Sequence, residues 1–284
     1  AILRGDVAVA SAEASPPPAR PYNGVYVLGQ DGEALEIVGQ IEDIAPGEQI
    51  YAARFLGPRG FLVTFERIDP LFAFDLSDPT APQLMGELKV PGFSDYLHPV
   101  GPNHLIGVGQ AIEEDGPWGQ QNMGIQVSLF DVTDWTSPQV VEQLTVGGPG
   151  SYADASLTHK AFTYMPESGL LALPATVVGG ASGSGEYSYR QTVLCYRVDT
   201  ATGFDPVGTL NCVGSASYYW FSSSWRRAAF VGETLYAATD DGVRAAPVAD
   251  LTQTTEVVFE RDQPPAWGWY DGWSGATEPS PGWR

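Results

Sequence analysis

The sequence is short of basic residues. Of 284 residues, 14 are Lys or Arg and 34 are Asp or Glu, which gives a formal net charge of −20. Binding to the phosphates of nucleic acids or anionic membranes needs clustered cations, and the sequence has no such cluster. The composition therefore argues against both kinds of partner. A solvated acidic surface is the simplest interpretation, and an acidic face for calcium or a cationic partner is the alternative.

Long apolar runs and helical periodicity are also lacking. No run of 18 or more apolar residues exists, so we expect no membrane-spanning helix. Apolar residues do not recur every 3.6 positions, which argues against repeats built from helices. The chain begins at Ala1 with neither Met nor a charged and apolar leader, and we interpret this as a processed or trimmed end.

Cysteine is scarce, with only Cys195 and Cys212 present. They lie on the two arms of a predicted hairpin, 192–214, whose turn we centre near Thr202-Gly203. Strands paired about that centre would bring the two sulfurs to disulfide distance, and we predict a disulfide. Two buried free thiols are the alternative; a metal site is disfavoured, because there are only two sulfurs and no nearby His. A disulfide would favour an extracellular compartment.

What the sequence does contain is a repeated pair of short strands. Residues 68–92, IDPLFAFDLSDPTAPQLMGELKVPG, alternate apolar positions, pass through a turn cluster and return as a second run. Residues 127–148, VSLFDVTDWTSPQVVEQLTVGG, repeat this pattern. Further copies occupy 192–214 and 25–47, and a weaker one begins at Asp241. A second pair of apolar runs begins near 53, 98, 160 and 226, so each unit holds about four strands, which is typical of a β-propeller.

The unit boundaries predict the architecture. Whole units are expected at 48–92, 93–148, 149–214 and 215–260, after an incomplete unit with strands at 25–28 and 34–40. We predict an all-β fold, a propeller of about five four-stranded blades with an incomplete first blade, standing alone or within a larger propeller. The expected divisions are 1–21, with a strand at 6–11 and a Pro-rich connection; 22–260, the propeller; and 261–284, a Trp/Pro-rich tail that packs on the propeller or faces a partner.

Two insertions interrupt the regular strands at 111–124, AIEEDGPWGQQNMG, and 178–189, VGGASGSGEYSY. Both lie between the second and third strands of their units, so we expect them to emerge on one face of the propeller. Loops gathered on one face are where repeat proteins usually place binding function. The first insertion combines the acids Glu113-Glu114-Asp115 with Trp118, which makes Trp118 a candidate binding residue.

Repeated aspartates in the turns raise the question of calcium. Asp75, Asp78, Asp131 and Asp134 supply the carboxylates that calcium prefers. Aspartate is also what such turns need, because its side chain accepts hydrogen bonds from backbone N–H groups two residues on. No D-x-D-x-D-G loop with a terminal Glu occurs. We therefore predict no cofactor and no metal site, with calcium as the alternative.

The first strands of consecutive units carry the candidates for a site. These strands line the channel of a propeller, so their polar side chains should converge at one mouth. His98 and His159 each follow an aspartate, Asp95 and Asp154, and a His–Asp couple can act as base and orienting group. Polar bonds between neighbouring blades are the structural alternative. The candidate binding residues are Arg54, Asp95, His98, Trp118, Asp154, His159, Trp225 and Arg226, with Arg227 beside them. No nucleophile, zinc or phosphate-loop motif is present.

These residues carry a resemblance to a known family. Residues 45–109, APGEQIYAARFLGPRGFLVTFERIDPLFAFDLSDPTAPQLMGELKVPGFSDYLHPVGPNHLIGVG, together with 128–164 and RRAAFVGETLYAATDDGVRAAPVADL, resemble bacterial and archaeal secreted proteins with a C-terminal β-propeller domain distantly related to WD repeats. The resemblance covers most of 22–260. It implies fold and export, but no activity.

The sequence departs from that family in its extent. Family members have further blades upstream, whereas this chain starts inside a blade, and its Trp-rich tail and cysteine pair are its own features. The remaining blades are therefore removed, lie on a second chain, or are not needed because about five blades close alone.

From this resemblance and the residues we expect a secreted or cell-surface, non-enzymatic binding or assembly scaffold. A protein partner or further copies of the chain would bind its loops or complete an unpaired blade edge. The alternative is an extracellular enzyme with Asp95, His98, Asp154 and His159 as an acid/base site at the channel mouth.

Overall fold

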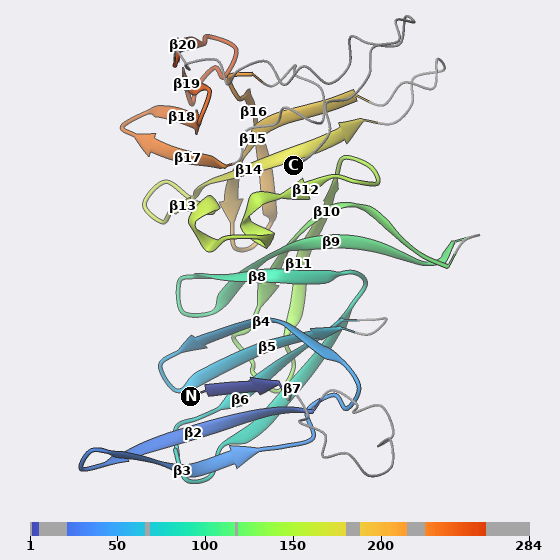
Figure 1. Cartoon of the computed structure of the whole chain (residues 1–284), viewed down its shortest axis with the longest axis vertical. Helices are drawn as coiled ribbons and strands as arrows, with labels where there is room; N and C mark the ends of the chain where they lie inside the picture. Colours follow the sequence, from blue (N-terminus) through green and yellow to red (C-terminus); the bar gives the residue numbers. More distant parts are fainter. Residues whose placement is uncertain are drawn as a thin grey trace, which may run out of the picture.

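The computed structural model describes residues 2–5, 22–65, 69–116, 119–179, 188–214 and 225–259. Within these ranges the chain forms five antiparallel sheets, whose strands follow one another in sequence, and two short 3-10 helices (Figure 1). In the same ranges, no helix has the length and apolar character needed to cross a membrane. The predicted all-β class is confirmed.

The first three sheets come from the N-terminal half. The first has the order β1 (Ile2–Gly5), β2 (Asn23–Asp31), β3 (Ala34–Ile41). The second contains β4 (Gln49–Leu56), β5 (Arg59–Phe65), β6 (Asp69–Asp75) and β7 (Gln83–Val90). The third contains β8 (Phe93–Val100), β9 (His104–Gly116), β10 (Gly119–Asp131) and β11 (Gln139–Val146).

The fourth sheet differs because its first strand is interrupted. β12 (Tyr152–Ala153) and β13 (Thr163–Met165) both pair with β14 (Leu170–Gly179), and η1 (Asp154–Ser156) and η2 (His159–Ala161) lie between them. The sheet continues with β15 (Ser188–Asp199) and β16 (Gly203–Asn211). The fifth sheet contains β17 (Arg226–Val231), β18 (Thr234–Thr239), β19 (Gly242–Pro247) and β20 (Thr255–Val258).

The units expected from the sequence correspond to these sheets, and the first sheet has three strands among the described residues. Its added strand is β1, which pairs with the start of β2 through Ile2 opposite Tyr26 and Gly5 opposite Asn23. The strand predicted at 6–11 and the tail at 261–284 lie outside the described residues.

The five sheets form an open row. Figure 1 shows the first sheet, in blue, and the fifth, in red, at opposite ends of the longest axis, with the others between them in sequence order. First strands contact one another along this row: β4 contacts β8, β8 contacts η1, and η2 and β13 contact β17. These first strands therefore make one continuous inner surface, while the described part of the chain does not close a ring.

Each interface between consecutive sheets contains one apolar cluster. β14 shows how this arises, because it is buried on both faces and its residues alternate between two clusters. Leu171 and Leu173 pack toward the third sheet, and Leu170 and Ala172 pack toward the fifth. Burying a Leu side chain contributes roughly 1.5–3 kcal/mol. The sheets are thus held together by their faces, as in a propeller.

A recurring joint fixes how each sheet meets the next. The outer strands β3, β7, β11 and β16 all have a bulge at the corresponding place. Directly after two of these bulges stand Gly39 and Gly86. A Cβ at Gly39 would collide with the carbonyl oxygen of Pro79, and one at Gly86 with that of Trp135. The turn of the following sheet therefore rests on bare backbone, which is why glycine is needed there.

The repeated aspartates build these turns. Asp75 and Asp78 accept hydrogen bonds from the backbone N–H groups of Ser77 and Thr80, at 2.8 and 2.9 Å. Asp131 and Asp134 repeat both bonds in the next sheet, at 2.8 and 2.9 Å. Hydrogen bonds from the side chain and backbone of the residue two positions on lower the pKa of all four carboxyls. The turn interpretation of these residues is confirmed.

The predicted disulfide between Cys195 and Cys212 is wrong: both are buried free thiols. The hairpin turns earlier than expected, with Asp199 opposite Gly203, so Cys195 faces Gly208. Cys212 instead donates its backbone N–H to the carbonyl oxygen of Gln191. The sulfurs are thus offset by four residues, about 13 Å along a strand, which is beyond the reach of a disulfide. Burial raises the pKa of each thiol to about 11.

Candidate binding surface on the inner strands

The inner surface has a charge balance opposite to that of the whole chain. We define it as the side chains of β4, β8, residues 152–165 and β17. It carries four of the 14 Lys and Arg residues and two of the three His residues, but only two acids. They are Arg54, Lys160, Arg226, Arg227, His98, His159, Asp95 and Asp154. A net-positive surface on a chain of net charge −20 is the first sign of a site for an anionic group.

Asp154 and Arg226 form a buried ion pair between the fourth and fifth sheets. They are only 6% and 3% exposed. The Arg226 Nε donates to Asp154 Oδ2 at 2.9 Å, Nη2 donates to Oδ1, and Nη1 donates to Thr176 Oγ1 at 2.7 Å. Burial by itself lowers the pKa of Arg226, but the hydrogen bonds and charge of Asp154 outweigh it and raise the pKa. Both Asp154 oxygens are therefore engaged in joining two sheets.

His98 lies in an aromatic cluster. Its ring stacks on Phe162 at a centroid distance of 4.4 Å and meets Tyr164 edge-on at 5.8 Å. The Tyr96 hydroxyl is 3.1 Å from His98 Nδ1. Burial, followed by the positive charge of Arg54, lowers the pKa of His98 to about 4. His98 is therefore neutral at pH 7 and lies among apolar rings.

Asp95 and His159, the other two members of the proposed acid/base site, form no hydrogen bond or ion pair with His98 or Asp154 in the part of the chain that the structure describes. Asp95 is half-buried on β8, and burial raises its pKa. His159 is exposed on η2. Contacts of the described residues pair Asp154 with Arg226 and His98 with Tyr96. Neither His–Asp couple of the enzyme hypothesis is formed in this part of the chain.

Arg54 projects from β4 toward the same cluster. Its charge acts on both His98 and Tyr96. Its Nε is buried and has no hydrogen-bond acceptor among the described residues. Arg54 and His98 were predicted from the sequence, whereas Tyr96, Phe162 and Tyr164 were not. Their spacing could have indicated them. Side chains two positions apart in an extended segment share a face, so 96 lies on the face of 98, and 162 on the face of 164.

The remaining predicted binding residues are dispersed. Trp225 is exposed directly before β17, and the Arg227 guanidinium lies 5.7 Å from the centroid of its ring. Trp118 lies outside the described residues. Most of the first insertion is strand, since β9 ends at Gly116 and β10 begins at Gly119, and the two strands project beyond β8 and β11 of the same sheet (Figure 1). Across the described ranges, no group of three or more His, Cys, Asp or Glu is placed to hold a metal ion.

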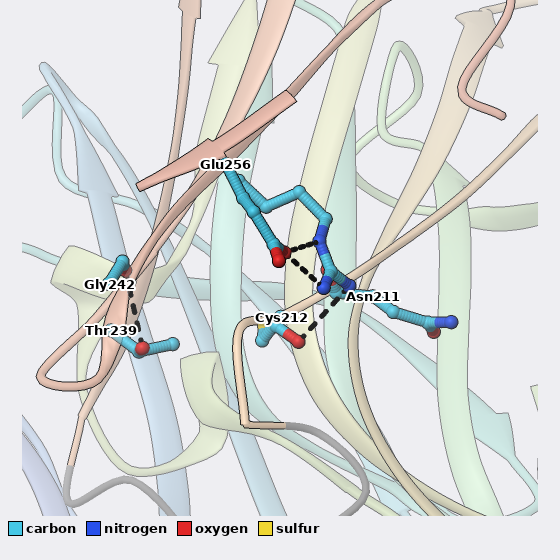
Figure 2. Close-up of polar contacts among 6 residues, drawn as sticks. Asn211, Cys212, Thr239, Gly242 and Glu256 are labelled. Carbon is cyan, nitrogen blue, oxygen red and sulfur yellow. Dashed lines mark hydrogen bonds and ion pairs between the residues drawn. The ribbon is translucent and has the colours of Figure 1, made fainter. Parts of the chain in front are cut away.

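A second cationic side chain joins the last two sheets away from the inner surface. Arg244 of β19 donates from Nε to Glu256 Oε2 at 2.9 Å, and from Nη1 to the carbonyl oxygens of Asn211 at 3.0 Å and Cys212 at 3.4 Å. Figure 2 shows Glu256 on one side and the Asn211 and Cys212 carbonyls on the other. A hydrogen bond from Thr239 Oγ1 to the Gly242 carbonyl oxygen, at 3.3 Å, closes the adjoining turn. Arg244 therefore bonds the end of the fourth sheet to the fifth.

Five antiparallel sheets packed face to face around their first strands define a β-propeller architecture. The chain belongs to the β-propeller domain family, whose model matches residues 4–251. An uncharacterized protein of Archaeoglobus fulgidus is 40% identical over 153 residues, covering 54% of this chain and 22% of that protein. An uncharacterized protein of Methanocaldococcus jannaschii is 40% identical over 121 residues, 43% of this chain and 18% of that protein.

The chain thus spans about a fifth of the length of these curated archaeal relatives. Among solved structures, Sqt1 from Chaetomium thermophilum is similar with a TM-score of 0.49 and 16% identity, covering 86% of this chain and 56% of that one. Synechocystis apocarotenoid oxygenase gives a TM-score of 0.37 and 12% identity, covering 85% and 56%.

Proposed function

We propose that this chain is a non-enzymatic binding scaffold that joins a protein partner at its last sheet. The observation that supports this is the apolar outer strand of that sheet. Val257, Val258 and Phe259 are 63%, 61% and 46% exposed. The faces of the inner sheets are covered by the next sheet along the chain, and the described residues provide no such cover here. An uncovered apolar strand of this kind favours association.

The sequence of β20 indicates what kind of surface fits there. Unlike the four earlier outer strands, it pairs with β19 without a bulge. Opposite Ala245, which corresponds to Ala73 opposite Gly86, β20 carries Thr255 in place of glycine. The joint used within the chain, a turn resting on bare backbone, is therefore not available at this strand. The partner surface we propose is apolar side chains that bury Val257 and Phe259, which are two positions apart and so lie on one face.

We further propose that the scaffold acts outside the cell. This rests on the resemblance to secreted proteins with propeller domains, since the absence of a disulfide removes the other argument for an oxidising compartment. The short match to much longer relatives fits a scaffold that works beside further blades, on the same polypeptide or on another chain.

The test is the mass of the native particle, isolated from source cells and analysed by mass photometry, with intact-mass spectrometry of every chain in it. We expect a particle above 30.4 kDa that contains a second chain or further copies. Val257→Glu should release the 30.4 kDa monomer, because a charge in an apolar interface is costly. Val231→Glu, on an equally exposed valine of β17 in the same sheet, is the matched control. A monomeric wild-type particle would refute the proposal.

A further inference from the structure

The inner surface stays positive after its internal pairing is taken into account. Asp154 neutralises Arg226, which leaves Arg54, Lys160 and Arg227 as cations and Asp95 as the one remaining carboxyl among the side chains of this surface. Burial raises the pKa of Asp95 and so weakens its tendency to be charged. Cations concentrated on one surface of an otherwise acidic molecule attract an anion to that surface.

One N–H donor of Arg54 lacks a hydrogen-bond acceptor among the described residues. A guanidinium carries five N–H donors, and a buried donor without an acceptor costs about 1–3 kcal/mol. The buried Nε of Arg54 has no acceptor among the described residues. A carboxylate suits a guanidinium, because its two oxygens match the planar fork of N–H groups.

The neighbours of Arg54 indicate the rest of the ligand. The centroids of the Tyr96 and Phe162 rings are 5.1 Å apart, and the His98 ring stacks on Phe162 and meets Tyr164 edge-on. All four rings are half-buried and come from β8 and from the segment that ends in β13. An aromatic surface beside a guanidinium suits a ligand with one charged end and an apolar or aromatic body.

We propose that Arg54 and the aromatic cluster of Tyr96, His98, Phe162 and Tyr164 form a binding site for a small carboxylate that carries an apolar or aromatic body. Arg54 holds the carboxylate, and the rings pack against the body. His98 lies within this cluster, so its ring signals report on the ligand. This site is separate from the outer strand of the last sheet, so it adds a small-molecule function to the proposed scaffold.

The experiment uses benzoate as the probe and the histidine ring signals in NMR spectra at pH 7 and constant ionic strength as the readout. We expect saturable shifts of the His98 signals at millimolar benzoate, with His104 and His159 unchanged as internal controls. Benzyl alcohol, which keeps the ring and lacks the charge, should cause no shift. Absence of a benzoate response, an equal response of all three histidines, or a response to inorganic phosphate in place of benzoate would each overturn the proposal.

Arg54→Gln tests the role of the guanidinium. Loss of charge-assisted hydrogen bonds should weaken benzoate binding about tenfold or more. Arg59→Gln is the control, because Arg59 lies over the Trp135 ring, away from the cluster. An unchanged affinity in Arg54→Gln would refute the proposal. Should that variant fail to fold, Tyr164→Leu provides a second test, since it removes one ring of the cluster and should weaken benzoate binding while keeping Arg54.

Discussion

At the scale of single residues, the most consequential contact joins two positions far apart in the chain. Asp154 and Arg226 are 72 positions apart and meet in a buried, bidentate arrangement. Buried pairs of this kind contribute little net stability compared with apolar residues of the same size, but breaking one leaves a buried charge without a partner. The pair therefore specifies how the fourth and fifth sheets meet.

Asp154→Leu should destabilise the protein by about 3–5 kcal/mol, because Arg226 stays buried without its counter-charge. The measurement is urea unfolding at pH 7. The double variant Asp154→Leu/Arg226→Met should recover much of that loss. Glu256→Gln, which breaks the more exposed pair with Arg244, should cost no more than about 1 kcal/mol. Equal costs for the two single variants would contradict this account.

His98 should make stability depend on pH between about 6.5 and 4. Its pKa is about 4 in the folded chain, mainly because of burial and then because of Arg54. The unfolded chain keeps the ordinary value near 6.5 and so binds more protons in this interval. Stability should therefore fall as the pH is lowered through it. Asp95 opposes this trend, because its raised pKa favours protonation in the folded state.

The contribution of His98 is isolated by His98→Phe, which keeps a ring against Phe162 and cannot be protonated. The difference in unfolding free energy between wild type and this variant should stay constant above pH 7. As the pH falls from 7 to 4, the wild type should lose stability relative to the variant. A difference that is independent of pH would show that His98 keeps an ordinary pKa. The same measurement in Arg54→Gln should show a narrower interval, since one cause of the shift is removed.

At the scale of elements, the unit of construction is a sheet with a bulged outer strand and an aspartate turn. The turn of one sheet reaches the outer strand of the sheet before it, as Trp135 reaches Gly86. Period-two alternation and turn residues predicted the strands and the turns from the sequence, but not the bulges. The ladder between β19 and β20 has no bulge and places Thr255 where the second sheet has Gly86, which is why this outer strand is expected to behave differently.

Gly86→Ala should destabilise the protein by about 1–3 kcal/mol, because the added methyl group meets a backbone carbonyl that cannot move without shifting the turn. Gly148→Ala is the control, since a Cβ there would have only the Val178 carbonyl oxygen nearby, at an ordinary 3.5 Å. Thermal unfolding of the two variants measures the contrast. Similar melting temperatures would mean that the turn does not rest on this strand.

At the scale of the whole molecule, the open row determines which parts are protected. The third and fourth sheets share the largest apolar cluster and have neighbours on both faces, whereas the first and fifth sheets lie at the ends (Figure 1). The thiols of the fourth sheet lie inside the next cluster, between the fourth and fifth sheets. Stability should therefore decrease from the centre of the row toward both ends.

Hydrogen exchange followed by mass spectrometry should show this gradient in the isolated chain. Amides of β14 and β15 should exchange slowest, and those of β3 and β20 fastest among the strands. In the native particle with its partner, β20 should gain protection while β14 stays unchanged, so the central strands serve as the internal reference. Uniform slow exchange along the isolated chain would mean that the terminal sheets are already covered.

Local patterns in the sequence were sufficient for the architecture. Alternating apolar residues, turn residues at repeated offsets and the spacing of about four strands per unit depend on neighbours in the chain, so the sheets and their order followed from them. Hairpin register did not follow as securely. The 192–214 hairpin centres on Ala201, earlier than predicted, and its second strand has a bulge; together these separated Cys195 from Cys212.

Contacts between sheets depend on packing and so came only from the tertiary structure. The Asp154–Arg226 pair, the ring stack of His98 on Phe162, and the buried Nε of Arg54 each require a precise distance between strands of different sheets. Residue spacing within the chain carries no record of those distances. The open row was decided in the same way, because whether sheets close a ring depends on the angle between neighbours and on what covers the two ends.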